Sequence, residues 1–212
     1  MNVQESYNTW SETYDKDQNY TRDLDELVTK ETLKNLHFKS IFEIGCGTGK
    51  NTILLAQIGE QVKSVDLSEG MIQKAKEKLN LNNVSFSVAN IINTWPCEDK
   101  SIDLIVCNLV LEHIEDLSFI FSEASRLLVD GGLFFICEFH PFRQYQGKKA
   151  NFQQEQEVTE ITAFIHNISD FINIAKSNSL RLKSFNEWWH EVDENKVPRL
   201  ASFLFEKSNT VS

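Results

Sequence analysis

The sequence lacks any apolar run long enough to span a bilayer, and its first residues, MNVQESYNTW, lack the basic and then apolar plan of a secretory signal. We therefore expect a cytoplasmic protein that does not enter a membrane. Positive charge is also scarce, because 21 Lys and Arg residues face 31 Asp and Glu residues and leave a formal net charge of -10. An acidic surface repels phosphates, so no nucleic-acid partner is expected.

Cysteine and histidine are few and scattered. The four cysteines, Cys46, Cys97, Cys107 and Cys137, form no CxxC pair, and the five histidines form no HExxH arrangement. This spacing is typical of buried free thiols and not of a disulfide framework or a zinc site. The sequence therefore predicts no metal site.

The chain has the size and composition of one globular domain. It has 212 residues, of which 41% are hydrophobic and 25% charged. That length is enough to bury a substantial core. No internal repeat or low-complexity tract divides the sequence, so we expect a single domain over residues 1–212.

Short β-rich runs alternate with longer helical ones through the middle of the chain. The runs predict strands at 40–45, 61–68, 84–90, 101–108 and 133–140, and helices at 51–59, 69–81 and 116–129, the last stopped by Asp130, Gly131 and Gly132. This alternation implies parallel strands joined by right-handed crossovers, and hence a doubly wound α/β sheet. The almost unbroken apolar strands fit such a sheet, because helices cover both of its faces.

The two ends of the chain depart from the alternation. Residues 1–36 are expected to be helical, and a further helix is expected at 168–180. The strand-like runs at 181–189 and 197–207 predict an antiparallel hairpin that completes the sheet. The connection 141–167 is long for a compact domain, and such insertions are often lids or binding loops.

A glycine-rich turn, GxGxG at Gly45, Gly47 and Gly49, follows the first strand directly. A Walker-type phosphate loop would need a glycine at Ile44 and does not fit. In a dinucleotide fingerprint the third glycine would stand where the chain has Lys50. The turn is therefore suited to a ligand whose backbone-facing part is compact and uncharged or zwitterionic.

Two polar residues end the next two strands. Asp66 can accept hydrogen bonds from both ribose hydroxyls of an adenosine, a role that occurs with NAD and with S-adenosylmethionine alike. Asn90 can accept a hydrogen bond from the adenine amino group while the amide of Ile91 donates to a ring nitrogen. Either residue taken alone is equally consistent with a turn former.

The stretches FEIGCGTGKNT, VDLSEGMIQKAK and LEHIEDLSFIFSEASRLLVDGGLFFICE together resemble the class I S-adenosylmethionine-dependent methyltransferases, in their broad small-molecule (type 11-like) branch. The resemblance covers about residues 38–140. It implies a Rossmann-like sheet of seven strands with the last strand antiparallel and helices on both faces. It also implies S-adenosylmethionine as cofactor, S-adenosylhomocysteine as product, and a small-molecule acceptor methylated on oxygen, nitrogen or sulfur.

The resemblance also assigns residues to the cofactor site. It puts the glycine turn under the methionine moiety, Asp66 at the ribose, and a segment of residues 1–36 over the cofactor. The family usually has Asp where this chain has Asn90, a change that keeps an acceptor and loses a charge. Arg22 is added by charge complementarity with the cofactor carboxylate. The predicted cofactor residues are Tyr14, Arg22, Gly45, Cys46, Gly47, Gly49, Asp66, Leu67, Met71, Asn90, Ile91, Asn108, Leu109 and His113.

For the acceptor, the candidate residues come from the end of the fifth strand and from the insertion 141–167. His140 is the candidate general base, because ligands of doubly wound sheets bind at the carboxyl edge and the pKa of histidine suits proton removal. The other candidates for the acceptor pocket are Phe142, Arg143, Tyr145 and His166. A polar loop residue at His140 and a solvated insertion are the competing interpretations.

Two other functions stay open. An NAD-dependent oxidoreductase of Rossmann type shares the fold and Asp66, although Lys50 speaks against it. A module that binds S-adenosylmethionine without transferase activity is the second, since a fold does not guarantee chemistry. The protein is expected to be a monomer or a homodimer.

Overall fold

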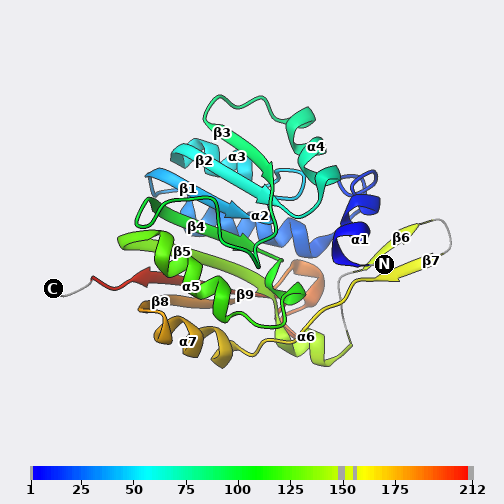
Figure 1. Ribbon diagram of the computed structural model, residues 1–212. Helices are drawn as coiled ribbons and strands as arrows, with labels where there is room; N and C mark the ends of the chain where they lie inside the picture. Colours follow the sequence, from blue (N-terminus) through cyan, green and yellow to red (C-terminus); the bar gives the residue numbers. More distant parts are fainter. Residues whose placement is uncertain (1, 148–150, 155–156, 210–212) are drawn as a thin grey trace.

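A computed structural model describes residues 2–147, 151–154 and 157–209, and between 151 and 160 only the backbone. Its main feature is a seven-stranded sheet with the strand order β3-β2-β1-β4-β5-β9-β8 (Figure 1). The strands are β1 (Phe38–Ile44), β2 (Gly59–Asp66), β3 (Val84–Val88), β4 (Ile102–Asn108), β5 (Leu128–Phe139), β8 (Leu180–Trp188) and β9 (Leu200–Lys207). The predicted doubly wound α/β architecture is confirmed.

Strand β9 alone runs against the others. It pairs antiparallel with both β5 and β8, whereas the pairs among β1 to β5 are parallel. The predicted closing hairpin and the antiparallel last strand are therefore confirmed. A second, two-stranded sheet of β6 (Asn151–Gln154) and β7 (Glu157–Glu160) lies within the insertion and was not expected.

Helices cover both faces of the sheet. The buried cluster on one face contains residues of α2 (Tyr20–Leu33) and α3 (Thr52–Ile58), and the cluster on the other face contains residues of α5 (Ser118–Leu127) and α7 (Ile168–Ser177). Successive strand residues alternate between the two clusters: Phe134 lies in one and Phe135 in the other. Since side chains of a strand point alternately to its two faces, unbroken apolar runs are what such a sheet requires.

The fifth strand begins earlier than predicted. Helix α5 ends at Leu127 and β5 begins at Leu128, so Gly131 and Gly132 lie inside the strand and do not stop the helix. Leu128 is fully buried and pairs with Ile102, after which the register shifts before Leu104. Burial of the leucine at the sheet therefore outweighs its helical periodicity. None of the described helices is long and apolar enough to cross a membrane.

The first helix is attached to the carboxyl edge of the sheet. Helix α1 (Val3–Trp10) packs on α4 (Glu69–Lys78), because Asn8 Oδ1 accepts hydrogen bonds from Ser68 Oγ (2.7 Å) and from Gly70 N (3.1 Å). Trp10, Met71 and Ile161 form a small buried cluster there. The N-terminal helix and the start of the segment after β7 thus meet beside the strand ends (Figure 1).

The strand order reverses between β1 and β4. From β1 the chain moves outward to β2 and β3, and then it returns to β4 on the other side of β1. The loops after these two strands diverge at such a point and leave a crevice at the carboxyl ends. The fold therefore positions a ligand site between the ends of β1, β2 and β4.

Candidate functional site

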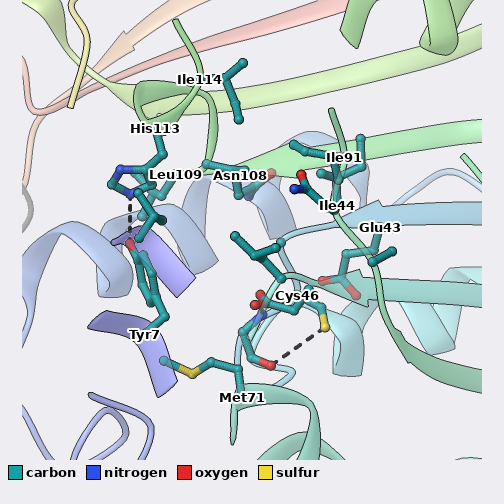
Figure 2. A pocket seen from close by; sticks show the side chains of 18 of the residues that line it. Tyr7, Glu43, Ile44, Cys46, Met71, Ile91, Asn108, Leu109, His113 and Ile114 are labelled. Atoms are coloured by element: carbon teal, nitrogen blue, oxygen red, sulfur yellow. Dashed lines mark hydrogen bonds between the residues drawn. The ribbon is translucent and has the colours of Figure 1, made fainter. Parts of the chain in front are cut away.

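A cavity of about 750 Å³ opens at these strand ends (Figure 2). Its volume lies within the range of small-molecule sites. All of the predicted cofactor residues except Gly49 line it, although they come from six separate segments of the chain. The structure thus brings together Tyr14, Arg22, Gly45, Cys46, Gly47, Asp66, Leu67, Met71, Asn90, Ile91, Asn108, Leu109 and His113.

The glycine turn forms one wall of the cavity. Gly45 and Gly47 have φ angles of 67° and 54°, a region that side chains other than glycine disfavour. A Cβ on Gly45 would lie 2.0 Å from Val110 Cγ2, so packing forbids any side chain there. A Cβ on Gly47 would meet nothing nearer than the Tyr14 ring at 3.9 Å, which leaves a bare main chain facing the cavity.

Gly49 was assigned to the cofactor and does not line the cavity. A Cβ at this position would lie 2.5 Å from Leu79 Cδ1 and 3.6 Å from Ala75 Cβ. The last glycine of the turn therefore allows the close approach of α4. Its place in the motif is explained by packing.

Asp66 ends β2 with its carboxylate already held in place. Its Oδ2 accepts from Gly47 N (2.9 Å) and its Oδ1 from Ser68 N (2.8 Å). Burial raises the pKa of Asp66, and the backbone donors oppose this shift. Each carboxylate oxygen keeps a second acceptor direction, so the pair can receive two further hydroxyl donors.

Asn90 closes a turn and also borders the cavity. It lines the cavity, and its Oδ1 accepts from Ile92 N (3.2 Å) to close a turn of its own. Ile91 is buried, and its carbonyl accepts from Trp95 Nε1 (2.8 Å). Leu67 and Met71 lie on the same cavity and provide an apolar surface.

A buried carboxylate connects α2 to the loops after β1 and β4. Asp25 accepts from Asn108 Nδ2 (2.7 Å) and from Asn51 Nδ2 (2.8 Å), while Asn108 Nδ2 also donates to Thr29 Oγ1 (2.6 Å). Burial raises the pKa of Asp25 to about 6. With both amide nitrogens committed, the Oδ1 atoms of Asn51 and Asn108 have no partner among the described residues.

Arg22 shapes the cavity as well as lining it. Its guanidinium lies 3.9 Å from the centroid of the Tyr14 ring, and Nη1 and Nη2 donate to the carbonyls of Tyr14 and Asp17. Its Nε is buried without a partner among the described residues. Burial raises the pKa of Tyr14 to about 12, which keeps the phenol protonated.

These orphan atoms fit the amino-acid end of the expected cofactor. Buried polar groups normally find a hydrogen-bond partner, and two amide acceptors with one cationic donor complement an ammonium and a carboxylate. Asp66 and the apolar surface beside it complement the ribose and the adenine. The described residues contain no cluster of three or more His, Cys, Asp or Glu that could hold a metal ion.

Glu43 is a cavity residue that the sequence did not point out. It is buried at the end of β1, and its Oε2 accepts from Thr52 Oγ1 and Ser64 Oγ, both at 2.6 Å. Burial raises the pKa of Glu43 to about 7. The carboxyl group joins β1, β2 and α3 directly behind the glycine turn.

His113 joins three segments at the other wall of the cavity (Figure 2). Its Nε2 lies 2.9 Å from Tyr7 Oη on α1, and its Nδ1 lies 2.8 Å from the carbonyl oxygen of Thr162. Tyr7 was also missed, because a tyrosine on a short amphipathic helix is ordinarily a packing residue. Its place in the site becomes visible through its hydrogen bond to His113, which lies 106 positions further along the chain.

The predicted acceptor residues lie outside the cavity. His140 is fully buried, caps α6 (Pro141–Tyr145), and has its Nε2 2.8 Å from Glu187 Oε1. Burial lowers its pKa, so protonation is disfavoured there. The contacts of the others are structural or solvent-facing: Phe142 is 57% exposed, Arg143 pairs with Asp193, Tyr145 donates to Asn167, and His166 Nε2 lies 2.7 Å from the Ile114 carbonyl.

The proline that follows His140 explains why its side chain does not reach the cavity. Proline at the first position of α6 turns the chain at the end of β5, and the imidazole accepts from Phe142 N as a helix cap. The side chain is thereby directed into the protein and away from the ligand crevice. From the insertion 141–167, the cavity is lined by Phe164 among the residues described; residues 148–150 and 155–156 lie outside them.

Comparisons with known proteins find methyltransferases similar to this chain. A family model described as a methyltransferase domain matches residues 42–136. The chain is 31% identical over 107 residues to a demethylmenaquinone methyltransferase of Tropheryma whipplei, covering 50% of this chain and 44% of that protein. It is 26% identical over 189 residues to malonyl-[acyl-carrier protein] O-methyltransferase 1 of Ilyobacter polytropus, covering 86% of this chain and 66% of that protein.

Solved structures share the fold. An S-adenosylmethionine-dependent methyltransferase from Clostridium acetobutylicum superposes with a TM-score of 0.72 at 20% identity, covering 96% of this chain and 99% of that chain. At this identity the likeness establishes the fold. The chain spans about half the length of the first curated relatives it matches.

Proposed function

Because a methyltransferase-domain model matches residues 42–136, we propose that the chain is a class I S-adenosylmethionine-dependent methyltransferase, which transfers the methyl group of S-adenosylmethionine to a small-molecule acceptor and releases S-adenosylhomocysteine. One observation supports this most strongly. A single cavity collects residues from the ends of β1, β2 and β4 and from α1 and α2, and its polar atoms match the parts of that cofactor. The acceptors named for the relatives, demethylmenaquinone and a malonyl carrier protein, differ in chemistry and leave the acceptor open.

In this proposal the cofactor lies across the glycine turn. The carboxylate of Asp66 receives the ribose hydroxyls, and Leu67, Met71 and Ile91 enclose the adenine. The orphan oxygens of Asn51 and Asn108 receive the ammonium group. Residues 1–36 cap the cofactor, since α1 and the N-terminal end of α2 border the same cavity.

The chain's own residues then have three tasks in catalysis. S-adenosylmethionine supplies an activated methyl group, so the protein needs to hold the acceptor atom in line with it and keep water away. Tyr14, which is stacked on Arg22, and the apolar side chains of Leu109 and Ile114 line the cavity and would exclude water from the bound cofactor. The buried Asp25 keeps the loops after β1 and β4 in one arrangement, because both Asn51 and Asn108 donate to it.

Calorimetric titration tests the proposal. We expect S-adenosylhomocysteine to bind the wild-type protein, and Asp66→Asn to weaken binding by about 10- to 100-fold, since hydrogen bonds to a charged group contribute about 1.5–3 kcal/mol. Asp99→Asn is the matched control, because this exposed aspartate pairs with Arg126 away from the cavity. Binding of NAD with no response to S-adenosylhomocysteine would instead support an oxidoreductase.

Binding alone does not separate a transferase from a module without activity. Incubating the protein with methyl-labelled S-adenosylmethionine and a metabolite extract addresses this second alternative. We expect label to move into a small-molecule fraction. Tight cofactor binding with no labelled product would favour the binding module.

A further inference from the structure

Part of the cavity wall consists of His113 and of residues that were not predicted to hold the cofactor. It is formed by α1, by the loop that contains η1 (Leu111–His113), by the start of α5 and by the segment after β7. Its apolar side chains include Val3, Val110, Ile114, Phe119 and Phe164. Its polar members besides Tyr7 and His113 are Asn2, Gln4, Glu115 and Asp116. Phe164 is fixed there because its N donates to the Glu112 carbonyl (2.6 Å). This part of the cavity is therefore suited to an apolar molecule.

The polar centre of this wall is the pair Tyr7–His113. The carbonyl oxygen of Thr162 can only accept a hydrogen bond, so His113 Nδ1 carries the proton that it receives (2.8 Å). In the neutral ring Nε2 is then an acceptor, and Tyr7 Oη donates to it (2.9 Å). With its own proton committed, Tyr7 Oη offers the cavity only its lone pairs. A ligand that pairs with it must bring an O–H or N–H donor.

Charge disfavours an anion at this wall of the cavity. Among the described lining residues, the only lysine and arginine are Lys50 and Arg22. Lys50 Nζ lies 2.8 Å from Asp23 Oδ1, and Arg22 is stacked on Tyr14 and bonded to two carbonyls. The exposed Glu115 and Asp116 line the cavity next to the apolar wall. A negatively charged acceptor at this wall meets like charge, and the Nε of Arg22, which has no partner among the described residues, is the donor proposed above for the cofactor carboxylate.

Resting on the proposed function, we infer that the methyl acceptor is an uncharged apolar molecule that carries a hydroxyl or an amine hydrogen, and that Tyr7 Oη accepts the hydrogen bond from this group. His113 is a positioning residue in this arrangement, since it fixes the direction of the Tyr7 proton. Thr162 in turn fixes the ring of His113. Tyr7, His113 and Thr162 come from three segments of the chain, and together they position the one hydrogen bond that recognises the acceptor.

Four probes with one naphthalene body test the inference by calorimetry at pH 7.5 in saturating S-adenosylhomocysteine. They are 1-naphthol, 1-naphthylamine, 1-methoxynaphthalene and 1-naphthoic acid. We expect 1-naphthol or 1-naphthylamine to bind about fivefold to tenfold more tightly than 1-methoxynaphthalene, as one hydrogen bond implies. The naphthoate should bind most weakly. Which donor binds better distinguishes a hydroxyl from an amine acceptor.

Tyr7→Phe should abolish the preference for the donor probes and leave the affinity for S-adenosylhomocysteine within about twofold. Tyr20→Phe is the matched control, because this half-exposed tyrosine stacks on His190 outside the cavity. The inference would be overturned if 1-naphthol, 1-naphthylamine and 1-methoxynaphthalene bound equally well, or if the naphthoate bound most tightly. It would also be overturned if no probe bound, or if the preference for the donor probes survived Tyr7→Phe. Failure of the wild type to bind S-adenosylhomocysteine would instead overturn the proposed function itself.

Discussion

Replacing single glycines of the turn separates packing from ligand contact. Gly45→Ala adds a Cβ 2.0 Å from Val110 Cγ2 at a φ of 67°. The left-handed backbone costs an L-residue about 1–2 kcal/mol, and overpacking adds about 1–3 kcal/mol. Gly47→Ala shares the backbone penalty, at φ 54°, but its Cβ has only an ordinary contact at 3.9 Å. We therefore expect Gly45→Ala to destabilise the fold by roughly 1–3 kcal/mol more than Gly47→Ala.

Urea unfolding measures this difference, provided that the slope of the free energy with denaturant stays constant. Val110→Ala in the Gly45→Ala background should recover the overpacking part, which a double-mutant cycle reports as a favourable coupling of about 1–3 kcal/mol. Equal costs for the two glycine variants, or no coupling with Val110, would refute the packing explanation.

The same variants should act differently on the ligand. Gly47→Ala places a methyl group on the bare main chain that faces the cavity, so it should weaken S-adenosylhomocysteine binding although the fold survives. A larger β-branched residue, as in Gly47→Val, should abolish binding. Unchanged affinity in both would mean that the turn is only a connector between β1 and α3.

Three further predictions concern other positions. Ser68→Ala removes the side chain that accepts from Met71 N (3.1 Å) and donates to Asn8, and it should lower the free energy of unfolding by about 1 kcal/mol. His140→Gln should leave the affinity for S-adenosylhomocysteine within about twofold, because His140 lies outside the cavity; a large loss in calorimetry would contradict this placement. Burial raises the pKa of Glu43 to about 7 against a usual value of 4.5, so the folded state holds its proton longer and stability falls as pH rises between these values. In urea unfolding, the free energy of unfolding of the wild type should be lower at pH 8 than at pH 5 by up to about 3 kcal/mol. This difference should be smaller in Glu43→Gln.

Much of the fold follows from local patterns in the sequence. Each strand from β1 to β4 lies within a few residues of its predicted bounds, and Gly59 ends α3 as expected. The boundary of α5 was wrong because burial of Leu128 at the sheet outweighs helical periodicity, a tertiary effect that no local window contains. The hairpin of β6 and β7 also has no clear signal, since its four-residue strands are short and polar.

The gathering of the predicted cofactor residues around one cavity has a related reason. Gly45, Asp66, Asn90 and Asn108 each follow or end a strand, and a doubly wound sheet brings the ends of parallel strands to one edge. Arranging the strands was therefore enough to arrange these side chains. No contact between the loops needed to be known.

The remaining site residues depend on contacts between distant segments. Asp25 meets Asn108 across 83 positions, and Tyr7 meets His113 across 106. Nothing in the spacing of these residues distinguishes them from ordinary surface or packing positions. The sequence also does not give the direction in which a side chain points. His140 was placed correctly at the end of β5, yet its side chain caps α6 inside the protein.

A crystal structure of the protein with S-adenosylhomocysteine tests the central claim most directly. The account predicts the nucleoside in the cavity, with both ribose hydroxyls within hydrogen-bond distance of the Asp66 carboxylate and the amino-acid end beside Asn51 and Asn108. A ligand bound elsewhere on the molecule, or a cavity that stays empty in crystals saturated with the compound, would contradict it.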